Sequence, residues 1–112
     1  MLLRFVCYTV TLAFAVVLAV PATAYADAID GDWCNGAASF QIRGPSIRTP
    51  AGTDMTGDYS RHAFRYVAPA GEKDAGAEVL MRLMNENTVY LMRRAAGAES
   101  AVETWQRCQP VS

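Results

Sequence analysis

The sequence has no excess of positive charge, a single histidine and no closely spaced cysteines. Its 112 residues carry 10 Lys and Arg against 11 Asp and Glu, so the formal net charge is −1. That balance excludes the strongly basic surface with which proteins bind nucleic acid. The single histidine, His62, and the three cysteines form no C-x-x-C motif and no Cys/His metal-ligand spacing. We therefore expect no metal site, no cofactor and no nucleic-acid partner.

The residue types of a hydrolytic triad occur close together in one place, at Asp58, Ser60 and His62. On a strand, residues 58 and 62 would lie about 13 Å apart at roughly 3.3 Å per residue, too far for a hydrogen-bonded Asp–His–Ser chain. The sequence also lacks the G-x-S-x-G motif that presents a nucleophilic serine. We predict that the protein is not an enzyme, and that His62 has a structural or partner-contacting role.

Charge is almost missing from the first 26 residues, where Arg4 is the one charged side chain. The apolar run 5–20 is ended by Pro21, and Ala24-Tyr25-Ala26 fits the small-x-small pattern of a signal-peptidase site. An uncleaved membrane anchor is the alternative, but the run is shorter than the roughly 20 apolar residues that a spanning helix needs. We predict a helical signal peptide at residues 1–26, a periplasmic or secreted protein, and no stable membrane insertion after cleavage. Cleavage after Ala24 also fits the rule.

Removing residues 1–26, which hold one arginine and no acidic residue, leaves 86 residues with 9 Lys and Arg, 11 acidic residues and a net charge of −2. We predict that residues 27–112 form a single domain. Cys7 would leave with the signal peptide, so Cys34 and Cys108 would form a disulfide in an oxidising compartment. Closing a loop of about 75 residues would stabilise the fold by roughly 4 kcal/mol. A redox-active or metal-binding pair is the other interpretation.

Short alternating runs separated by turn residues recur along residues 27–112, which favours strands over helices. Residues 39–43 and 46–49 are predicted to form a hairpin around Gly44-Pro45, followed by an exposed loop at 50–57. Residues 59–67 are predicted to be one strand. Its alternation would separate two sets of side chains, namely His62, Phe64 and Tyr66 on one face and Arg61 and Arg65 on the other.

The most apolar segment is predicted to be a central hairpin, formed by residues 77–84 and 88–93 around Asn85-Glu86-Asn87. A helix is the alternative for residues 77–84, because Leu, Met, Glu and Ala favour it. Both faces of this hairpin would be apolar, since they carry Leu80, Met81, Leu83, Met84, Leu91 and Met92. Such a hairpin is either buried within a closed barrel or exposes a patch that a ligand or partner covers.

The remaining segments complete an all-β fold. Residues 68–76 and 95–100 are predicted loops, and residues 101–109 a last strand, which gives about six strands. We predict a small antiparallel meander, either a curled sheet or a small barrel. A bridge between Cys34 and Cys108 would join the first strand to the last and curl the sheet towards closure.

Strand parity makes a specific prediction about the two ends of the domain. Because neighbours on a strand face opposite ways, a Cys34–Cys108 bridge would place Trp33, Trp105 and Arg107 together on the other face. The guanidinium would then stack on an indole, a contact worth roughly 0.5–2 kcal/mol. Simple packing of the two tryptophans is the alternative.

Gly31-Asp32-Trp33 near the start of the domain and Arg107 near its end resemble the G-x-W motif and closing arginine of the lipocalin and calycin β-barrels. The resemblance covers the two ends of the chain. It implies a barrel in which Arg107 lies over Trp33 at a closed end, and it suggests a binder of a small apolar ligand. In size, export signal, terminal cystine and β content, the chain is also similar to small periplasmic β-barrels that inhibit lysozymes or act as envelope accessory proteins.

Tyr59, Arg61, His62 and Arg65 form the candidate binding surface. Arg and Tyr are favoured interface anchors, so this face would dock an acidic partner, although a solvated strand face is the plainer interpretation. We predict a non-enzymatic interaction, accessory or inhibitor module that binds an envelope protein. The alternative is a lipocalin-like binder of a small apolar ligand, with the Met/Leu hairpin as the wall of its pocket.

Overall fold

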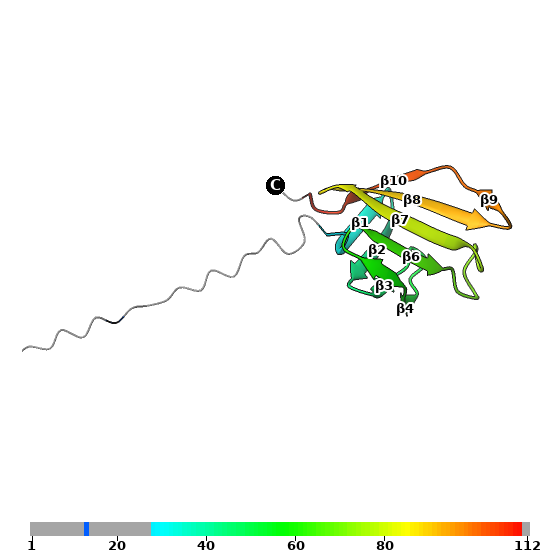
Figure 1. Cartoon of the computed structure of the whole chain (residues 1–112), viewed down its shortest axis with the longest axis horizontal. Helices are drawn as coiled ribbons and strands as arrows, with labels where there is room; N and C mark the ends of the chain where they lie inside the picture. The colour runs from blue at the N-terminus through cyan, green and yellow to red at the C-terminus, as the bar shows by residue number, and fades with distance from the viewer. Residues whose placement is uncertain (1–12, 14–27, 111–112) are drawn as a thin grey trace, which may run out of the picture.

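The structure, a computed structural model, describes residue 13 and residues 28–110. The regular structure of this part is entirely β-strand, which confirms the all-β class (Figure 1). The strands are β1 (Gly31–Asn35), β2 (Ala38–Arg43), β3 (Ser46–Arg48), β4 (Asp54–Thr56), β5 (Asp58–Ser60), β6 (Ala63–Val67), β7 (Glu78–Asn85), β8 (Thr88–Ala95), β9 (Ala98–Glu99) and β10 (Glu103–Arg107). The predicted signal peptide, with the exception of residue 13, lies outside the described residues.

The strands form one antiparallel sheet that nearly closes into a barrel. Their order is β4-β3-β2-β1-β10-β8-β7-β6-β5, with β9 beside the end of β8. The first strand therefore pairs with the last, and Trp33 lies opposite Arg107 in the register. The two ends of this order, β4 and β5, are consecutive in the chain and are joined by one residue, Gly57.

Gly57 allows the chain to pass from one side of the barrel seam to the other. Its N–H donates a hydrogen bond of 2.9 Å to the carbonyl of Pro45. A Cβ at this position would lie 2.5 Å from the carbonyl oxygen of Arg65 and 2.6 Å from the ring of Phe64. Such contacts with backbone and a buried ring leave no room for a side chain. Glycine is required here by close packing.

Alternating side chains from both halves of the sheet fill the barrel interior. In β2, β6, β7 and β8, buried residues alternate with outward-facing ones, as expected of strands with one face on a core. The buried cluster consists of Ile29, Trp33, Phe40, Ile42, Ile47, Phe64, Tyr66, Ala68, Val79, Met81, Val89, Leu91 and Trp105. The described barrel is thus packed with side chains in the manner of a small protein core.

Several predicted segments differ from the structure, and the last strand is shorter than predicted, at residues 103–107 instead of 101–109. The predicted strand 59–67 is two strands, because the chain reverses at Arg61-His62 and Ser60 pairs with Ala63. The short strands β4 and β9 lie within segments that were predicted as loops, each held by pairing with one neighbour. The part of the sheet that the structure describes therefore has ten strands where about six were expected.

Both predicted hairpins are present. β2 and β3 pair around Gly44-Pro45, and β7 and β8 form the long central hairpin of Figure 1. The helix alternative for residues 77–84 is wrong, since these residues lie almost entirely within β7. The connection is Glu86-Asn87, one residue shorter than predicted, because Asn85 still pairs with Thr88.

Candidate binding surface

One end of the barrel is closed by Arg107. Its guanidinium carbon lies 4.4 Å from the ring centroid of Trp33, and the side chain is 6% exposed. The guanidinium donates hydrogen bonds to the carbonyls of Ala28 and Asp30, at 2.8 Å each, and to that of Glu86. Burial lowers the pKa of Arg107 from its ordinary value. The stack lies on the face that strand parity predicts and combines a cation–π contact with hydrogen bonds to buried carbonyls.

Gly31 gives the Arg107 guanidinium room to reach this position. A Cβ on Gly31 would lie 2.5 Å from Nη1 of Arg107. The φ of Gly31 is 129°, a backbone conformation that residues with a side chain rarely adopt. Of the four residues predicted to close the barrel, Gly31, Trp33 and Arg107 meet at this point. Trp105 is also buried, but it packs against Phe40 with a centroid distance of 4.9 Å.

The cysteine pair ties the same two strands together from the other face. Cys34 and Cys108 have their sulfurs at bonding distance and their Cα atoms 5.0 Å apart. The N–H of Cys108 also donates to the carbonyl of Asp32, at 3.0 Å. The sequence separation of 74 residues makes this link a constraint on nearly the whole described domain.

The predicted docking patch is not assembled as an open basic surface. Arg61 and His62 form the turn between β5 and β6, so their predicted strand faces are wrong. Arg65 does lie on β6, but it is ion-paired with Glu78 at 2.7 Å and with Asp58 at 3.0 Å. The hydrogen bond from Arg65 lowers the pKa of Glu78, and the same contacts raise the pKa of Arg65.

Tyr59 is likewise engaged within the domain. Its hydroxyl donates a hydrogen bond to the Asp30 carboxylate, whose other oxygen accepts from the N–H of Gly44 at 2.7 Å. The hydrogen bond to Asp30, followed by partial burial, raises the pKa of Tyr59. The Ile29 N–H donates to the Arg61 carbonyl at 2.7 Å, so segment 28–30 seals this end of the barrel. Tyr59 and Arg65 thus already have partners within the fold.

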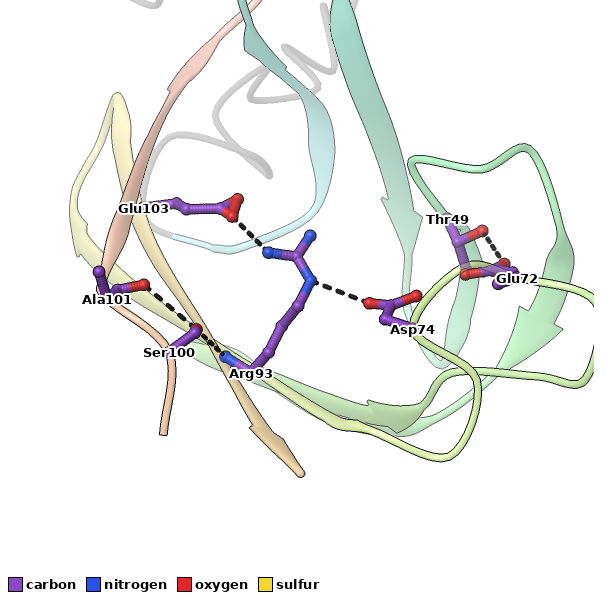
Figure 2. Close-up of polar contacts among 7 residues, drawn as sticks. All are labelled: Thr49, Glu72, Asp74, Arg93, Ser100, Ala101 and Glu103. Carbon is purple, nitrogen blue, oxygen red and sulfur yellow. Dashed lines mark hydrogen bonds and ion pairs between the residues drawn. The ribbon is translucent and has the colours of Figure 1, made fainter. Parts of the chain in front are cut away.

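The opposite mouth of the barrel holds an ion-pair network around Arg93. Figure 2 shows its guanidinium between Asp74, at 2.9 Å, and Glu103. Burial lowers the pKa of Arg93, but the ion pairs outweigh it, so the net shift is upward. Beside this network, Thr49 donates a 2.7 Å hydrogen bond to Glu72. Burial followed by the nearby acids raises the pKa of Tyr66. These polar groups pair with one another and close this mouth of the barrel, so they have a structural role.

The outer face of the central hairpin presents an apolar groove of about 520 Å³. On β7 and β8, Val79, Met81, Val89 and Leu91 point into the core, while the alternate residues point outward. Leu80 and Met92 are directly opposite each other in the register and are half-buried. The groove is completed by more exposed side chains, namely Met84 (48% exposed), Tyr90 (43%) and Val102 (55%). We call the set Leu80, Met84, Tyr90, Met92 and Val102 the outer groove.

Arg82 lies within the outer groove, between Ala63 on β6 and Tyr90 on β8. It is exposed and, among the described residues, makes no ion pair or side-chain hydrogen bond. His62 and Ser60 line the edge of the groove near β5. The residues that line this groove include no carboxylate. The groove is therefore apolar with a cationic group in its wall.

Other site types are not supported within the described residues. There, no group of three or more His, Cys, Asp and Glu side chains could hold a metal ion. Residues 13 and 28–110 also contain no helix long and apolar enough to cross a membrane. Comparison with protein-family models, curated proteins and solved structures gives no match. The lipocalin resemblance thus rests on the few residues that carry it.

The sequence indicated this surface in part. The two-sided apolar hairpin predicted either burial or an exposed patch, and the structure shows both, one on each face. Tyr90, Arg82 and Val102 were missed as site residues. The first two share the outward parity of Leu80 and Met92, so alternation could have found them. Val102 joins the groove through the pairing of β10 with β8, which no local pattern reveals.

Proposed function

We propose that this protein is an exported, non-enzymatic binding domain of the cell envelope that docks a partner protein on its outer groove. One observation carries the proposal: Met84 on β7, Tyr90 on β8 and Val102 just before β10 are exposed around a groove that no described part of the chain covers. Tyr and Met are enriched at protein interfaces, and clustered exposed apolar side chains mark sites of interaction. Export is supported by the apolar segment 5–20 and by the Cys34–Cys108 pair, which suits an oxidising compartment.

The shape of the groove favours a protein over a small ligand. Sites for small molecules bury roughly 70–90% of the ligand surface. Here three of the lining side chains are about half exposed, and the described barrel interior is filled by the core cluster. The groove volume of about 520 Å³ does fall within the range of small-molecule sites, so an apolar ligand on this outer face is the alternative.

A pair of matched variants tests the proposal. Val102→Lys places a charge in the outer groove, whereas Val67→Lys changes a valine of similar exposure outside it, 45% exposed against 55% for Val102. Affinity capture from envelope extract should recover the same partner protein with wild type and Val67→Lys, and much less with Val102→Lys. Equal recovery with all three proteins would contradict docking at the groove. An apolar compound extracted from wild type by organic solvent, and not from Val102→Lys, would support the small-ligand alternative.

A further inference from the structure

Arg82 constrains what can occupy the outer groove. Its cross-strand neighbours are Ala63 and Tyr90, and Met84 and Leu80 follow and precede it at alternate positions on the same face of β7. An occupant that covers these apolar side chains also removes water from the guanidinium. A desolvated cation without a partner is costly, because burial penalises the charged form and Arg does not release its proton. The occupant must therefore supply hydrogen-bond acceptors beside Arg82, and a carboxylate is the strongest acceptor for a guanidinium.

The other arginines show that the missing carboxylate is a local property of this site. On the outer face, Arg48 pairs with Asp54, Arg65 with Glu78 and Arg94 with Glu99. Arg43 also makes no ion pair among the described residues, but it is exposed, lies opposite Ser46, and lines a hollow whose other lining residues include the carboxylate of Asp54. Arg82 alone of these side chains lines an apolar groove and makes no ion pair among the described residues, although Glu86 shares the lining of an adjoining hollow with it.

We propose that the outer groove recognises an acidic peptide segment of the partner, in which a Leu or Phe side chain fills the groove and an adjacent carboxylate pairs with Arg82. This inference rests on the proposed function and specifies the chemistry of the partner. The groove lining contributes the guanidinium of Arg82 and no acidic residue, so its charge complements an acidic segment even though the chain as a whole is slightly acidic. Arg suits this role because its planar fork binds a carboxylate through two parallel hydrogen bonds.

A peptide titration tests the proposal directly, with protein purified after expression of the full chain. The probe is the acetylated and amidated hexapeptide Ala-Glu-Leu-Phe-Glu-Ala, and its counterpart has both Glu replaced by Gln. Methyl NMR signals of Leu80, Met84, Met92 and Val102 report occupancy of the groove. The Glu peptide should bind about five- to tenfold more tightly than the Gln peptide, as expected of one charge-assisted pair, and the preference should fall with added salt.

Two arginine variants locate the effect. Arg82→Gln should abolish the preference for the Glu peptide, whereas Arg43→Gln, the other exposed arginine that lacks a described partner, should retain it. Equal affinity of wild type for both peptides, with shifts confined to the groove methyls, would overturn the acidic specificity and leave the docking function standing. A preference that survives in Arg82→Gln would overturn the assignment to this residue.

Other occupants give different results. Dodecanoate that shifts the groove methyls in an Arg82-dependent way, while neither peptide does so, would overturn the peptide proposal in favour of a fatty-acid anion. Concentration-dependent shifts of the same methyls without any probe would instead identify a second copy of this chain as the occupant. Failure of every probe, together with equal partner capture by Val102→Lys and wild type, would overturn the proposed function itself.

Discussion

Arg107 and Arg82 lie in the same small barrel in opposite settings. Arg107 at the closed end is 6% exposed, stacks on Trp33 and donates to three backbone carbonyls. Arg82 in the outer groove is exposed and has no such contact among the described residues. A residue whose contacts are satisfied within the fold contributes to stability, and one that lacks them is available for recognition. The closed end should therefore govern folding and the outer groove should govern binding.

The largest effect is expected from the cystine that staples the closed end. Cys34→Ser or Cys108→Ser should each lower the free energy of unfolding by roughly 4 kcal/mol, because either change frees a loop of about 74 residues in the unfolded chain. The double variant should be no less stable than either single variant, since one cross-link is lost in all three. Urea denaturation of oxidised protein measures this. Additive losses, or free thiols at Cys34 and Cys108 in the native wild type, would contradict the bridge.

A smaller loss is expected when the arginine of the closed end is removed. Arg107→Ala should cost about 1–3 kcal/mol, because it removes the stack on Trp33 and leaves buried carbonyls without their donor. Arg43→Ala is the control and should change stability by less than about 0.5 kcal/mol, since it is exposed and outside the core. Thermal melts of both variants decide the matter. An Arg107→Ala protein that melts like wild type would mean that the closed end does not govern folding.

The smallest effect concerns an exposed ion pair near the groove. Arg65 holds the pKa of Glu78 below its ordinary value, so the pair stabilises the fold above the unfolded pKa of Glu and loses that contribution as pH falls through the lowered folded pKa. Arg65→Gln should raise the pKa of Glu78 towards the ordinary value, as followed by carboxyl NMR titration. Arg94→Gln should raise it less, because Arg94 acts on Glu78 only at longer range. The effect on melting should be minor, since exposed pairs are screened by water and salt.

An equal response of the Glu78 carboxyl to Arg65→Gln and Arg94→Gln would show that general surface charge, rather than the specific pair, sets its pKa. Arg65 would then be more available to bind a partner than its ion pairs with Asp58 and Glu78 indicate. A large loss of stability in Arg65→Gln would show that residues outside the closed end also govern folding.

The closed end could be predicted from sequence because it depends on a rule with period two. Once Cys34 and Cys108 are taken to pair, the faces of Trp33 and Arg107 follow from alternation, and the structure places them there. The turn at Arg61-His62 could not be predicted in the same way, since neither residue is a usual turn former. It is fixed by tertiary contacts, among them the hydrogen bond from Ile29 to the Arg61 carbonyl.

The groove depends even more on long-range pairing. β4 looks like a loop until β3 pairs with it, and Val102 joins Leu80 and Met92 only because β10 lies beside β8. The sequence pattern does predict two apolar faces for the hairpin of residues 77–84 and 88–93. The order of strands in the sheet decides which face stays uncovered. No single segment of the sequence determines that order.

The pairing of β1 with β10 also bears on how the molecule is made. β1 is synthesised early, but the strand that completes its pairing follows some 70 residues later. Without β10 the strand order separates into two parts, β1 to β4 and β5 to β9, and β1 and β8 each lack the neighbour that β10 provides. Contacts between segments so distant in sequence form slowly, because the intervening chain must be ordered first. A nascent chain therefore cannot finish this barrel before residues 103–107, its last strand, have been made.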